Sequence, residues 1–97
     1  MRYSAETRLT VHEVMQRAVD YFGPSGTAGL AVTEQSDYRI VFAGGGGYII
    51  AEARRMPSGS RIELEVQEFD REAQSFLGTL PGAGGGWLQN LLDRLRG

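Results

Sequence analysis

The hydrophobic pattern changes period near the start of the chain, and this change restricts the fold more than any other feature of the sequence. From Arg2 to Leu9 apolar and polar residues alternate, as they do in a strand with one buried face. From Val11 to Phe22 apolar residues recur every three or four positions, which predicts an amphipathic helix. Thr10 and Glu13 fit a capping box at its start. Gly23-Pro24 fits its end, with Gly23 in the left-handed conformation.

Four more strand patterns follow before the next helical one. They cover residues 29–34, 38–43, 48–54 and 61–69. Short turns separate them, including the four glycines Gly44–Gly47 and a type I turn over Met56–Gly59. Consecutive strands joined by short turns form an antiparallel meander. Asp70 is then placed to cap a second helix, whose apolar stripe comprises Ala73, Phe76, Leu77 and Leu80.

The order of elements predicts an α+β fold. It is a two-layer sandwich in the order β-α-β-β-β-β-α, because two amphipathic helices must bury their apolar stripes against one face of the sheet. With 97 residues, the chain has the length of one domain. We expect that domain over residues 1–81, a glycine-rich tether over 82–86, and a short amphipathic C-terminal helix over 87–97.

This order resembles the TBP-like and helix-grip folds, in which a curved antiparallel sheet wraps a helix. The family it is most similar to is the polyketide cyclase/START-like superfamily, through the opening strand Tyr3–Leu9 and the helix Val11–Phe22. The resemblance implies a cavity between sheet and helix that holds a small apolar ligand. That family has more strands, a second early helix and a longer chain, so no site residue is carried over from it.

The composition excludes several classes of chemistry. The chain has no cysteine, so it has no disulfide, thiolate nucleophile or sulfur-ligated metal. All ten basic residues are arginine, which excludes Schiff-base chemistry and the P-loop lysine. The net charge of −2 disfavours nucleic-acid binding. The bias toward arginine indicates either a GC-rich bacterial genome or adaptation to heat.

The motifs that could carry catalysis each lack a required residue. His12-Glu13 begins like the zinc-protease helix motif, but Gln16 stands where the second histidine belongs. Gly23–Thr27 lacks the last glycine of a nucleophile elbow. Glu52, Glu63 and Glu65 fit cross-strand ion pairs better than a metal site, because arginines are interspersed with them. We therefore expect no enzymatic activity, no metal and no cofactor.

The sequence also lacks a recognisable leader or an apolar stretch of about 20 residues that would span a bilayer. It therefore predicts a cytoplasmic protein that does not associate with membranes.

Two surfaces are candidates for contact with a partner. If Tyr38, Ile40, Phe42, Ile49, Ala51 and Ala53 face the helices, then Val41, Tyr48 and Ile50 lie together on the outer face of the sheet. The register at the glycine turn decides which set is buried. The second surface is the apolar side of the C-terminal helix, which comprises Trp87, Leu88, Leu91, Leu92 and Leu95. This helix could pack on its own chain or on a second copy.

Two functions follow as expectations. The first is a small non-enzymatic interaction module, homodimeric through the outer sheet face or the C-terminal helix. The alternative is a protein that binds a small apolar ligand between sheet and helix. The candidate lining residues, which could equally be packed core, are Phe22, Leu30, Phe42, Phe76 and Leu80.

Overall fold

A computed structural model describes residues 1–82 of the chain. The elements are β1 (Arg2–Thr7), α1 (Val11–Phe22), β2 (Ala31–Gln35), β3 (Arg39–Gly44), β4 (Gly47–Met56), β5 (Gly59–Gln67) and α2 (Asp70–Gly78). This confirms the predicted α+β sandwich and its element order. The predicted tether beyond Gly82 and the helix 87–97 lie outside the described residues.

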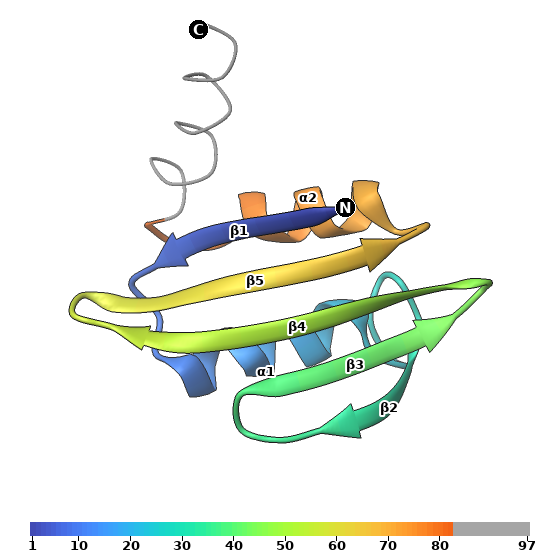
Figure 1. Cartoon of the computed structure of the whole chain (residues 1–97), viewed down its shortest axis with the longest axis horizontal. Helices are drawn as coiled ribbons and strands as arrows, with labels where there is room; N and C mark the ends of the chain where they lie inside the picture. The colour runs from blue at the N-terminus through green and yellow to red at the C-terminus, as the bar shows by residue number, and fades with distance from the viewer. Residues whose placement is uncertain (83–97) are drawn as a thin grey trace, which may run out of the picture.

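The five strands form one antiparallel sheet in the spatial order β1-β5-β4-β3-β2. Strands β2 to β5 are a meander, as predicted, and β1 completes the sheet by pairing with β5 from Arg2↔Glu65 to Thr7↔Ser60. Both helices lie on the same side of the sheet, with α1 behind β4 and β5 and α2 behind β1 and β5 (Figure 1). The other side of the sheet carries no helix of the described residues.

Helix α1 begins at the predicted capping box. The backbone N–H of Glu13 donates to Thr10 Oγ1 at 3.1 Å, and the Thr10 N–H donates to Glu13 Oε1 at 3.0 Å. These bonds favour the ionised carboxylate and lower the pKa of Glu13 below its ordinary value. One side of the helix, with Val14, Met15, Ala18 and Phe22, is buried against the sheet.

Removal of this cap gives a first testable prediction. Thr10→Ala is expected to lower the free energy of unfolding by about 1 kcal/mol, because the Glu13 N–H loses its side-chain acceptor. Urea denaturation of the full chain measures the change. Thr27→Ala, in an exposed loop, is the matched control and should leave the midpoint unchanged. Equal midpoints for the two variants would contradict the role of the cap.

The backbone conformation after the last residue of α1 and the cap at the start of α2 differ from the predictions. Gly23 has an extended backbone, with φ −71° and ψ −173°, and is not left-handed. It is required there for another reason, because a Cβ at this position would lie 2.5 Å from the Val19 carbonyl oxygen. Asp70 does not cap α2, since the cap position is Phe69 and no side chain bonds the helix end. Instead, Asp70 Oδ1 accepts a 2.6 Å hydrogen bond from the Tyr3 hydroxyl.

The structure shows which residues of β3 and β4 form the buried face of the sheet. Ile40, Phe42, Ile49, Ala51 and Ala53 are buried. The glycine connection that sets this register is a two-residue turn, Gly45-Gly46, between the paired ends Gly44 and Gly47. Both turn residues have positive φ, +56° and +84°, as a type I′ hairpin requires. The rest of the core comprises Ala5, Val14, Met15, Ala18, Phe22, Leu30, Ile62, Leu64, Val66, Ala73, Phe76, Leu77 and Leu80.

Within residues 1–82, neither helix has the length and apolar character that crossing a membrane would require.

Candidate functional site

The helix-free side of the sheet, called here the open face, carries a small apolar centre. Val41 and Ile50 are direct partners across β3 and β4, and Tyr48 lies two residues before Ile50 on the same strand. All three side chains are half-buried. The structure therefore places the three predicted outer-face residues together.

Charged residues of both signs border this centre except on the side of the glycine turn, where Tyr48 lies beside Ala43 and Gln67. Arg2 pairs with Glu65 at 3.0 Å, Arg61 pairs with Glu63 at 3.4 Å and with Glu6 at 3.6 Å, and Arg39 pairs with Glu34 and Glu52. The Tyr48 hydroxyl donates to Glu65 at 3.3 Å. Such half-exposed pairs each contribute at most about 1 kcal/mol. Their main effect is to give the open face a mixed and nearly balanced charge.

Two rows of the open face set like charges directly against each other. Glu52 is the cross-strand partner of Glu63, and Arg54 is the partner of Arg61 in the next row. Like charges directly opposite each other destabilise an isolated sheet. Each row also holds the opposite charge, because Arg39 lies beside Glu52 and Glu6 lies beside Arg61, so ion pairs within the chain offset part of this repulsion.

The same carboxylates do not form a metal centre. Within residues 1–82 there is no group of three or more histidine, cysteine, aspartate or glutamate side chains placed to hold a metal ion. A shallow hollow of about 190 Å³ on the open face is lined by Arg2, Ile50, Glu65 and neighbouring residues. Its carboxylates are paired with arginine, so the arrangement has the character of a charged contact surface.

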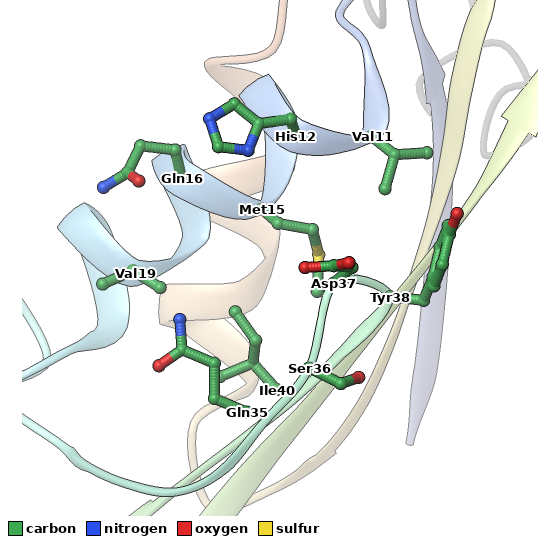
Figure 2. Close-up of a pocket in the computed structure, with 10 residues that line it drawn as sticks. All are labelled: Val11, His12, Met15, Gln16, Val19, Gln35, Ser36, Asp37, Tyr38 and Ile40. Carbon is green, nitrogen blue, oxygen red and sulfur yellow. The ribbon is translucent and has the colours of Figure 1, made fainter.

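On the helix side of the sheet, an open groove runs between α1 and the β2–β3 hairpin. We call this cavity of about 400 Å³ the α1 groove. Figure 2 shows its lining residues: Val11, Met15, Val19 and Ile40 supply apolar surface, and His12, Gln16, Gln35, Ser36, Asp37 and Tyr38 complete the lining. His12 and Gln16 stand on α1, and Asp37 and Tyr38 come from the hairpin.

A second cavity adjoins the α1 groove. This cavity, called here the Arg8 hollow, has a volume of about 530 Å³ and is lined by Arg8, Thr10, Val11, His12, Tyr38, Arg55, Met56 and Gly59. The two cavities share Val11, His12 and Tyr38, so they adjoin at these residues. Tyr38, expected to face the helices, instead precedes β3 and is 62% exposed. It borders both cavities and also a hollow of about 280 Å³ with Glu52, Arg54 and Arg61 of the open face.

The two cavities are not evident from the sequence pattern. Their walls come from α1, the β2–β3 hairpin and the β4–β5 hairpin, which are distant in sequence. The one available signal was the helical stripe of α1. Val11 and Val19 belong to that stripe, yet both remain partly exposed.

The candidate ligand-lining residues occupy the packed core. Phe22, Leu30, Phe42, Phe76 and Leu80 are each 0–3% exposed. The Phe22 ring lies 5.6 Å from the ring of Phe42 and 4.9 Å from that of Phe76, centre to centre. They are absent from the linings of the α1 groove and the Arg8 hollow. The other candidates, Trp87, Leu88, Leu91, Leu92 and Leu95, lie outside the described residues.

The remaining polar cluster joins β1 to α2. Besides its bond to Asp70, the Tyr3 hydroxyl accepts a hydrogen bond from Gln74 Nε2 at 3.2 Å. The bond to the Asp70 carboxylate raises the pKa of Tyr3, because ionisation would remove the donated proton and set two anions side by side. These two hydrogen bonds therefore connect β1 to α2 and have a structural role.

Comparisons with known proteins add a distant likeness. No family description and no curated protein matches the chain. The X-ray structure of the protein SSP2350 from Staphylococcus saprophyticus is similar at 14% sequence identity and a TM-score of 0.48. The match covers 79% of this chain and 77% of that one. We draw no functional conclusion from a likeness at this level.

Proposed function

We propose that this protein is a small non-enzymatic interaction module that forms a homodimer through the open face of its sheet. One observation carries the proposal. The cluster of Val41, Tyr48 and Ile50 lies on a sheet face that no described helix covers, and charged residues border it on every side except that of the glycine turn. An apolar centre within a polar rim is the usual anatomy of a protein–protein interface.

Charge complementarity favours a second copy of this chain as the partner. A two-fold interface brings the same surface from both subunits together, so it must be self-complementary. The open face carries both signs close together, because its Glu52–Glu63 pair lies next to its Arg54–Arg61 pair, although Glu52, Glu63 and Arg61 also make ion pairs within the chain. Rotation of one copy can set each row against the opposite charge of the other.

The size of the face is also sufficient. Its strands are 5 to 10 residues long. At strand spacings of about 4.8 Å and rises of about 3.3 Å per residue, five such strands present on the order of 600 Å². Two copies together would bury about 1,200 Å², at the lower end of specific interfaces.

The variant Ile50→Arg tests this proposal. Within one chain the new guanidinium would lie opposite Glu65 and can pair with it, so the fold should tolerate the change. At a dimer interface the same charge would be buried, and we expect dissociation to become at least about 100-fold more favourable. Sedimentation velocity over a micromolar concentration series measures the mass of the full chain.

The wild type should sediment at twice the chain mass of 10.6 kDa, and Ile50→Arg at the single mass. Ser75→Arg places the same residue on the exposed side of α2, on the helix side, and should remain dimeric. A wild type that stays at the single mass at every concentration would overturn the proposal. So would an Ile50→Arg protein that remains dimeric.

A further inference from the structure

We propose that the Arg8 hollow binds a small organic phosphate, namely a phosphate monoester that carries an aromatic ring. The hollow lies at the start of α1, on the helix side of the sheet. The inference is therefore independent of the dimer proposed above, which uses the open face.

Two arginines carry the inference. Arg8 and Arg55 both line the hollow, and none of its lining residues within 1–82 is acidic. In this part of the chain neither arginine is paired with a carboxylate, since the ion pairs are made by Arg2, Arg39 and Arg61. The net charge of the chain is −2. The hollow is thus a local concentration of positive charge on an acidic protein, and such a site attracts anions.

Different parts of the chain bring the two arginines together. Arg55 follows Ala53 on the face of β4 that the helices cover, and Arg8 directly follows β1. Ser60 lies between them in the sheet, because it is the cross-strand partner of Arg55 on one side and of Thr7 on the other. Figure 1 shows the β4–β5 turn, the end of β1 and the start of α1 at the same end of the sheet.

The segment that carries Arg8 is held in place by the hairpin and by the end of the described chain. Ser60 is fully buried, and its hydroxyl donates to the Leu9 carbonyl oxygen at 2.8 Å. The Arg8 N–H donates to the Pro81 carbonyl oxygen at 3.3 Å. A Cβ on Gly59 would lie 2.6 Å from the Arg8 Cα, so the two backbones are in contact. The backbone of the site is therefore ordered before a ligand binds, which lowers the entropic cost of binding.

The charge of the two guanidinium groups fits a phosphate monoester better than a carboxylate. Each guanidinium has five N–H donors in a planar fork, which can bind two oxygens of one anion. A phosphate monoester carries a charge of about −1.5 to −2 at pH 7 and has three terminal oxygens. It can therefore neutralise both arginines and accept hydrogen bonds from both, whereas a carboxylate offers one charge and two oxygens.

Two further donors line the same hollow. His12 has ring N–H groups, and Thr10 has a hydroxyl group. The carboxylate nearest to them in sequence belongs to Glu13, which accepts the Thr10 N–H in the capping box of α1 and is not among the lining residues. Thr10 and His12 can thus donate to phosphate oxygens that the arginines leave open.

The rest of the hollow suits an aromatic ring. Val11 and Met56 offer apolar surface, and the exposed ring of Tyr38 can stack on a flat group. Figure 2 shows the Tyr38 ring beside Val11. The volume of about 530 Å³ lies within the range of small-molecule sites.

NMR titration of the ¹⁵N-labelled full chain with phenyl phosphate tests the proposal. We expect saturable shifts of the backbone amide signals of Arg8, Thr10 and Gly59. Arg55→Gln should weaken binding at least about ten-fold, because charge-assisted hydrogen bonds are lost. Arg8→Gln should have an effect of the same size, so the test does not depend on the folding of one variant.

Arg71→Gln is the matched control, because it removes the same charge from an exposed position on α2 that does not line the hollow. It should bind phenyl phosphate as the wild type does. Sedimentation velocity of Arg8→Gln and Arg55→Gln should give the wild-type mass. Failure of the phosphate site is therefore distinguishable from failure of the dimer.

Two further measurements separate the phosphate group from the ring. Inorganic phosphate should shift the same amide signals but bind at least about ten-fold more weakly than phenyl phosphate, because it buries no apolar area. Tyr38→Ala should weaken the binding of phenyl phosphate and leave that of inorganic phosphate unchanged.

Four outcomes would overturn the inference. The first is the absence of a saturable shift at millimolar phenyl phosphate. The second is a set of shifts confined to residues outside the hollow. The third is equal affinity of the wild type, Arg8→Gln and Arg55→Gln. The fourth is equal affinity for phenyl phosphate and inorganic phosphate, which would show that the ring makes no contact.

Discussion

Replacement of Phe22 by alanine is expected to lower the free energy of unfolding by about 3–5 kcal/mol. Phe22 is fully buried at the end of α1, and its ring contacts those of Tyr21, Phe42 and Phe76. It thus joins α1, β3 and α2 at one point. Movement of one element alone cannot fill the cavity that alanine would leave, because the walls of that cavity belong to α1, β3 and α2.

Thermal and urea denaturation of the full chain measure this loss. A domain of this size should lose more than about 10 °C in melting temperature. Phe22→Leu keeps most of the volume and should cost less than about 1.5 kcal/mol. A loss below about 1 kcal/mol for Phe22→Ala would instead indicate a loosely filled interior, as expected of a protein that binds an apolar ligand between sheet and helix.

The elements themselves were largely predictable from the sequence. Helix α1 begins and ends at the predicted residues, because a capping box and an uninterrupted apolar stripe act within one segment of chain. The strands shift by a few residues at their ends. The placement of β1 beside β5 was not predicted, since a period of two indicates which face of a strand is buried and says nothing of its neighbour.

The sequence-based predictions were wrong where a residue distant in sequence determines the local geometry. Asp70 has the side chain of a helix cap, but Tyr3, which is 67 positions away, donates its hydroxyl proton to it. The alternation of Tyr38 with Ile40 gives the buried side correctly for Ile40, but Tyr38 precedes β3 and is exposed. The exposure of Tyr38 depends on where the hairpin lies relative to α1, and no local pattern contains that information.

Gly59 is the clearest example of a residue whose role is set by a contact with residues distant in sequence. Its place at the end of a Pro-Ser turn suggested a role in the turn, where glycine is common. In the structure it is the first residue of β5, with φ +148°. The added constraint comes from the link between β1 and α1. A Cβ on Gly59 would lie 2.0 Å from the Thr7 carbonyl oxygen and 2.6 Å from the Arg8 Cα, so backbone would have to move.

Gly59→Ala is therefore expected to cost about 3 kcal/mol or more, from an unfavourable φ together with a backbone overlap. Gly29→Ala is the matched control, because Gly29 also has positive φ, +62°, but has open space around it. It should cost about 1–2 kcal/mol, from the left-handed conformation alone. Urea denaturation of both full-length variants separates the two contributions. Equal losses would show that the approach of Thr7 and Arg8 to the hairpin is loose. A large difference would show that the wall of the Arg8 hollow is held by a contact that only glycine permits.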